Sequence, residues 1–81
     1  MTTKDFYLSA YLIATGFPLL SANKSAGLTI FEFAETPKLN NTISNYYSFN
    51  SSVEPILYGN AMRNLKTIIH SNATNQYHSQ Q

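Results

Sequence analysis

The 81-residue sequence predicts a small single-domain α+β protein. Two apolar segments separated by turn residues indicate an antiparallel hairpin, and three segments with helical spacing of apolar residues flank it. The predicted order is helix, strand, strand, helix, helix, with the hairpin packed on helices. This order contains no strand–helix–strand unit, so we expect no parallel sheet with a crevice for a cofactor.

The first helix is predicted from a cap at Thr2 or Thr3 to about Thr15, because Gly16 suits the position after a helix end. One apolar stripe of this helix is expected to face the core: Phe6, Ala10 and Ile13.

Leu8 and Leu12 lie on the other side of this helix, which is therefore apolar around most of its circumference. A chain this short cannot easily surround such a helix. We therefore expect a homodimer in which Leu8 and Leu12 are candidate self-association residues. The alternative is that the second helix folds back and covers them within one chain.

The hairpin is predicted from strands at residues 17–22 and 28–34, joined by a five-residue turn at 23–27. Alternation in the second strand places Phe31 and Phe33 on one face and Ile30 and Glu32 on the other. An isolated two-stranded sheet is barely stable in water. We therefore expect the first and third helices to cover one face.

Thr36 followed by Pro37 predicts the start of the second helix, because the pair supplies an N-cap and a proline in the first turn. The third helix is predicted from about 53–55 to His70. The domain then spans residues 1–70, and the polar residues 71–81 form a flexible tail. The predicted core consists of Phe6, Ala10, Ile13, Leu20, Phe31, Phe33, Leu39, Ile43, Leu57, Ala61, Leu65 and Ile68.

The third helix has a polar side opposite its apolar stripe. This candidate binding face consists of Asn60, Arg63, Lys66, Thr67 and His70. Two fixed positive charges one turn apart can bind phosphates or an acidic protein surface. An ordinary solvated helix face is the simpler interpretation.

The charge balance does not favour the hypothesis that the protein binds nucleic acid. The net charge is +1, whereas proteins that track phosphates usually carry a basic excess. Aromatic residues on an open sheet can stack single-stranded bases, and the candidates are Phe31 and Phe33 on the hairpin, followed by Tyr46, Tyr47 and Phe49. A role in the core is the simpler interpretation.

The sequence offers no convincing catalytic or metal site. It has no cysteine, and its two histidines, His70 and His78, fall at a helix end and in the tail. We expect no enzymatic activity, no cofactor and no metal. No apolar run approaches the roughly 20 residues that span a bilayer, so we expect a cytoplasmic protein with no membrane partner.

Several short motifs together resemble a small family of uncharacterised bacterial domains of unknown function. They are Lys4–Leu12 closing on Gly16-Phe17 and Leu19-Leu20, then Phe31-Glu32-Phe33, Tyr46-Tyr47, Val53-Glu54-Pro55 and Ala61–Lys66. The resemblance covers about residues 3–70. It implies a helix ending in Gly-Phe, a Phe-rich strand and a terminal helix with Leu-Lys, and it carries no activity.

These observations predict a small protein-interaction module without catalytic activity that acts as a homodimer. The alternative is a nucleic-acid-binding accessory protein for single-stranded DNA or RNA. It would use Arg63 and Lys66 on phosphates and exposed aromatic residues on bases.

Overall fold

The computed structural model describes residues 1–74 and confirms the predicted α+β order, with one additional strand. The elements are β1 (Thr2–Thr3), α1 (Phe6–Ala14), β2 (Leu19–Ser25), β3 (Leu28–Phe33), α2 (Pro37–Tyr47) and α3 (Pro55–Thr74). α3 therefore ends four residues later than expected, and the predicted tail begins too early. The rest of that tail, residues 75–81, lies outside the described residues.

The sheet has three antiparallel strands in the order β1-β3-β2, so β3 is central. Thr2 pairs with Glu32 and Thr3 with Phe31. The Phe33 N–H also donates to the Met1 carbonyl oxygen at 2.8 Å. β1 could not be predicted, because two residues are too few to show the alternation of a strand.

The hairpin turn is shorter than predicted. β2 continues through Asn23–Ser25, and the turn consists of Ala26 and Gly27, with φ of +52° and +83°. Positive φ at both central residues is typical of a type I′ turn, whose twist matches that of the flanking strands. Tight pairing of Ser25 with Leu28 therefore keeps the polar residues 23–25 in the strand.

Leu20 is exposed, so its predicted place in the core is wrong. The register shifts between Leu19 and Ser21, which pair with the consecutive residues Phe33 and Glu32. Leu20 is the extra residue of this β-bulge. Leu19 packs against the core instead.

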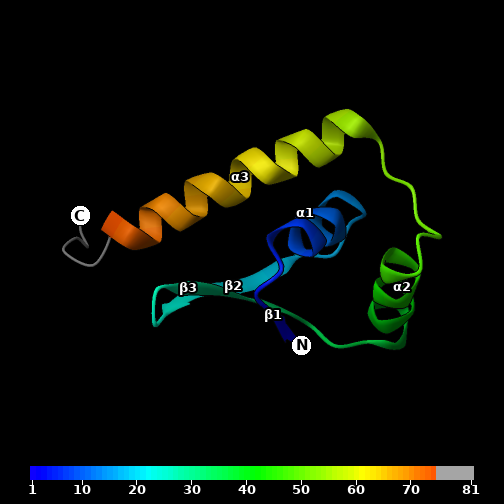
Figure 1. Ribbon diagram of the computed structural model, residues 1–81, viewed down its shortest axis with the longest axis horizontal. Helices are drawn as coiled ribbons and strands as arrows, with labels where there is room; N and C mark the ends of the chain where they lie inside the picture. Colours follow the sequence, from blue (N-terminus) through cyan, green and yellow to red (C-terminus); the bar gives the residue numbers. More distant parts are fainter. Residues whose placement is uncertain (75–81) are drawn as a thin grey trace.

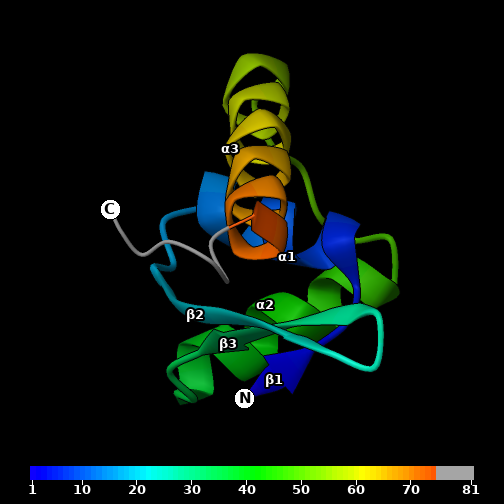
Figure 2. The same cartoon turned by 90° about the vertical axis from the view of Figure 1, so that its left-hand side faces the viewer.

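Helix α1 lies between the sheet and α3, and α2 lies at one end of the molecule (Figures 1 and 2). Five consecutive residues of α1, Leu8 to Leu12, are buried. Leu8 is only 2% exposed and Leu12 0%, so the prediction that these residues are left for a second subunit is wrong. One chain surrounds α1 because α2, α3 and the inner face of the sheet cover different sides of it.

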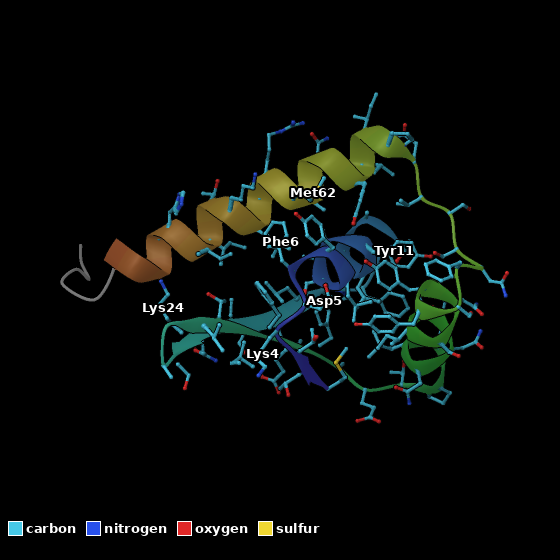
Figure 3. The ribbon with its side chains drawn as sticks, viewed as in Figure 1. Lys4, Asp5, Phe6, Tyr11, Lys24 and Met62 are labelled. Atoms are coloured by element: carbon cyan, nitrogen blue, oxygen red, sulfur yellow. The ribbon has the colours of Figure 1, made fainter. Side chains whose placement is uncertain are left out.

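The other residues predicted for the core are buried, partly buried or exposed, depending on their position. Six residues are buried as expected: Ala10, Phe31, Phe33, Leu39, Ala61 and Leu65. Four are partly buried: Phe6, Ile13, Ile43 and Ile68. Phe6 lies between α1 and α3 in Figure 3. Leu57 is exposed, because it lies roughly 80° around the helix from the fully buried Leu65.

Candidate functional site

The polar face of α3, defined as Asn60, Arg63, Lys66, Thr67 and His70, is exposed at all five positions. It lies opposite the buried Ala61 and Leu65. The Arg63 guanidinium donates to the Asn60 side-chain oxygen, and the Thr67 hydroxyl donates to the Arg63 carbonyl at 3.1 Å. The arrangement matches the sequence prediction, and its role in binding stays a prediction.

Other groups needed for nucleic-acid binding do not join this face. Lys4 and Lys24 lie on the sheet side of the molecule in Figure 3, and Lys38 is in the first turn of α2. Phe31 and Phe33 are buried under the helices, so neither is available to stack on bases.

Three helix ends meet around Asp5, which is the N-cap of α1. Its Oδ1 accepts from the Leu8 N–H at 3.0 Å, and its Oδ2 accepts from the hydroxyl of Tyr47, the last residue of α2, at 2.7 Å. In the first turn of α3, the Tyr58 hydroxyl donates to the Tyr7 carbonyl of α1 at 3.3 Å. These bonds join the start of α1, the end of α2 and the start of α3.

Aromatic rings reinforce this junction. Tyr11 points from α1 toward α2 (Figure 3), and its ring centroid lies 5.1 Å from that of Tyr46. Tyr46 and Tyr47 contact edge to face at 5.2 Å. Such ring pairs each add about 0.5–1.5 kcal/mol beyond the area they bury. α2 is therefore held at α1 by ring contacts as well as by the bond to Asp5.

Exposed apolar side chains are found at or beside each of these three helix ends. Within residues 1–71, seven large hydrophobic residues are exposed, and five of them lie at these helix ends. We call this surface the aromatic end: Tyr7, Tyr47, Phe49, Ile56 and Leu57. Beside it is a pocket of about 370 Å³, lined by Tyr46, Tyr47, Phe49 and Ser51. The sequence pointed to Tyr46, Tyr47 and Phe49 as aromatic candidates, but it did not predict that they lie beside the starts of α1 and α3, because Tyr46 and Tyr47 continue the helical spacing of core residues.

Phe49 is the most unusual residue of the aromatic end. Its φ is +62°, in the left-handed region, and its side chain is 94% exposed. The Asn50 N–H donates to the Asn45 carbonyl at 2.9 Å and the Phe49 N–H to the Tyr46 carbonyl at 3.3 Å. These two bonds form a Schellman motif that ends α2, with Phe49 at the position that glycine usually occupies.

The same motif ends α1, where the equivalent residue is Gly16, with φ of +107°. There the Phe17 N–H donates to the Leu12 carbonyl at 2.9 Å and the Gly16 N–H to the Ile13 carbonyl at 3.1 Å. A side chain in left-handed conformation costs about 1 kcal/mol. Phe49 carries this cost although it buries almost nothing, which points to a role at the surface.

Both tyrosines at the end of α2 have raised pKa values. The hydrogen bond to Asp5 raises the pKa of Tyr47 to about 12, with smaller contributions from burial and from the Asp5 charge. Burial raises the pKa of Tyr46, and the neighbouring Tyr58 and Asp5 raise it further. At neutral pH both phenols are therefore uncharged donors.

The Asp5→Asn variant is expected to lower the pKa of Tyr47 from about 12 toward the ordinary value of 10. Because the folded pKa lies above the unfolded one, the contribution of Tyr47 to stability is complete below pH 10. It is lost as the pH rises to about 12. A titration of phenolate absorbance measures the pKa, and Tyr47→Phe identifies its signal. An unchanged curve in Asp5→Asn would contradict the bond to Asp5.

Within residues 1–74, no three histidine, aspartate or glutamate side chains come together in a way that could hold a metal ion. In the same part of the chain, no helix combines the length and apolar character needed to cross a bilayer.

A protein-family model described as a domain of unknown function (DUF5659) matches residues 1–71, which confirms the resemblance to an uncharacterised domain family. No curated protein and no solved structure matches the chain.

Proposed function

We propose that this chain, which belongs to the DUF5659 family, is a protein-interaction module without catalytic activity that acts as a homodimer through its aromatic end. The observation that carries the proposal is Phe49. Its exposed ring occupies a backbone position that favours glycine, so the residue makes the fold less stable and adds apolar surface.

A second copy of the chain fits the aromatic end for two reasons. Large apolar side chains that stay exposed at the three helix ends favour association. Only 11% of the residues are charged and the net charge is +1, so repulsion between copies is weak. Contact about a two-fold axis covers the surface of both copies at once. The aromatic end thus replaces Leu8 and Leu12 as the proposed interface.

Light scattering at micromolar concentrations tests the homodimer. The expected mass is twice that of the 9.1 kDa chain. Phe49→Gly is expected to shift the mass to that of a monomer and also to raise the free energy of unfolding by about 1 kcal/mol. Because the variant folds more stably, its loss of association cannot come from unfolding.

Leu28→Ser is the matched control. It removes an exposed apolar side chain beside the hairpin turn, far from α2 in Figure 1, so the dimer is expected to persist. A wild-type mass of 9.1 kDa at every concentration, or a Phe49→Gly variant that remains dimeric, would contradict the proposal.

The proposal that the protein has no catalytic activity rests on the positions of the side chains that could act as a base or an acid. His70 is exposed on the polar face of α3, whereas Asp5 at the helix junction binds the Leu8 N–H and the Tyr47 hydroxyl. A nucleophile–base pair oriented by an acid needs such groups together. Their separation supports an interaction role.

Nucleic-acid binding is the second candidate, favoured by one observation. Arg63 and Lys66 are both exposed on the polar face of α3. Fluorescence anisotropy with labelled single-stranded and duplex oligonucleotides tests it. Binding at low salt that weakens steeply as salt rises would support this function, and no binding at low salt would exclude it.

A further inference from the structure

The pocket at the end of α2 is built mainly from aromatic rings. Its lining consists of Tyr46, Tyr47, Phe49 and Ser51, so three of the four side chains are rings. The rings of Tyr46 and Tyr47 stand at 80° to each other with their centroids 5.2 Å apart, so they line the pocket as two walls at nearly a right angle. The volume of about 370 Å³ falls within the roughly 300–1,000 Å³ that is typical of ligand pockets.

Contacts with α1 and its N-cap hold two of these rings in place. The Tyr46 ring packs on the ring of Tyr11 with the centroids 5.1 Å apart, and the Tyr47 hydroxyl donates to the Asp5 Oδ2 at 2.7 Å. Side chains that are already ordered lose less conformational entropy when a ligand binds. Two walls of the pocket are therefore in place before a ligand arrives.

The charges around the pocket favour a cation. Tyr46 and Tyr47 are the last two residues of α2, where the helix dipole has its negative end, and the last turn contains no basic residue. The charged residue of this helix, Lys38, lies roughly 14 Å back along the axis, beyond the screening length of about 8 Å at physiological salt. Asp5 adds a negative charge at the Tyr47 hydroxyl, and this charge contributes to the raised pKa values of both tyrosines.

Ring faces and a shortage of hydrogen-bond acceptors select the kind of cation. The face of an aromatic ring attracts a cation placed within about 6 Å of its centre. Besides the two phenol groups, the lining side chains offer one hydroxyl, that of Ser51. An ammonium brings three N–H donors and a guanidinium five, so each would lose hydrogen bonds with water that these side chains cannot all replace. A quaternary ammonium has no N–H donor and avoids this loss.

We propose that this pocket binds the trimethylammonium group of a small quaternary ammonium compound, held against the rings of Tyr46, Tyr47 and Phe49. A volume of about 370 Å³ holds a whole molecule of this kind. The site accounts for Phe49, whose exposed ring stands at a position that favours glycine. Tyr47 and Phe49 also belong to the aromatic end, so the ligand and a second copy of the chain compete for the same two rings.

Choline is the probe for this site. Ligand-observed NMR in dilute protein measures its Kd, which is extrapolated to zero protein concentration so that dimerisation does not enter. The expected Kd is about 1 mM. Ethanolamine, which carries a primary ammonium, and the neutral tert-butyl isostere of choline are each expected to bind at least about fivefold more weakly. Equal binding of the neutral isostere would overturn the role of the cation.

Phe49→Leu tests the third ring. It keeps an apolar side chain at the same backbone position but removes the ring, so the Kd for choline is expected to rise about fivefold. Tyr7→Leu is the matched control, because it removes an exposed ring of the aromatic end that does not line the pocket. Its Kd is expected to change less than about twofold. An unchanged Kd in Phe49→Leu, or equal changes in the two variants, would overturn the site.

A peptide that contains trimethyl-lysine tests the source of the cation. Binding of this peptide more than about tenfold tighter than that of choline would overturn the assignment to a small molecule and point to a modified protein partner. Binding within about threefold of choline supports it, because the trimethylammonium group is then the part that is recognised.

The outcomes separate this site from the proposed homodimer. Choline binding by a wild-type chain that is monomeric at every concentration would support the site and contradict the homodimer. A dimer that forms while choline at about 20 mM does not bind would overturn the site and leave the homodimer standing. Where both form, choline at ten times its Kd is expected to raise the dimer Kd more than about tenfold, and an unchanged dimer Kd would contradict the shared use of Tyr47 and Phe49.

Discussion

Leu12→Glu is expected to unfold the chain. Leu12 is 0% exposed and lies in the last turn of α1, the helix between the sheet and α3. A carboxylate there is cut off from water with no cation to pair with among the surrounding core side chains, which are apolar except for Ser9. We expect a loss of more than about 4 kcal/mol, close to the whole stability of a small domain. Circular dichroism during thermal and guanidinium unfolding measures it.

Leu20→Glu is the control for this prediction. It introduces the same charge at an exposed leucine on the β-bulge, where the change is expected to stay within about 0.5 kcal/mol. A Leu12→Glu variant that keeps the wild-type melting temperature would contradict the central position of α1. It would also reopen the interpretation of Leu12 as a contact between subunits.

Phe33→Ala is expected to cost about 3–5 kcal/mol, the usual range for a buried phenylalanine. Phe33 is 1% exposed and lies on β3, the strand that pairs with both of the others. The substitution therefore leaves a cavity between the sheet and the helices. Chemical denaturation gives the free energy, and Phe49→Ala is the matched control at an exposed ring. Equal losses at the two positions would contradict the packing of the sheet described above.

The order of the elements could be read from the sequence because each has a local signal. The Thr36 hydroxyl accepts from the Leu39 N–H at 3.0 Å, as an N-cap should, and Gly16 ends α1 as expected. Phe31 and Phe33 face the core because their alternation specifies it. Local chemistry thus decides which elements form.

Features that depend on distant parts of the chain could not be predicted in the same way. The pairing of Thr2 with Glu32 joins residues far apart in the sequence, and the bulge at Leu20 follows from the register with β3. The burial of Leu8 and Leu12 depends on where α3 packs. The apolar pattern shows that these residues will be buried. It does not show whether the same chain or a second subunit buries them.

The candidate site was found only in part, for a related reason. The polar face of α3 follows from helical periodicity alone, so all five of its residues could be named. The aromatic end combines residues from three helix ends, which are joined through Asp5 and through the Tyr58–Tyr7 hydrogen bond, and no single segment encodes it. One feature of this surface is local. A Schellman motif ends α2, and Phe49 occupies the position in it that is usually a glycine.

The central place of β3 has a consequence for the order in which the sheet folds. β2 and β3 are joined by a two-residue turn, so their hairpin closes a very short loop and can form within microseconds. β1 reaches β3 only after a loop of almost thirty residues closes, which is slower and entropically more costly. In hydrogen exchange, the amides of β1 should therefore open first, while the β2–β3 hairpin stays protected until the domain unfolds globally.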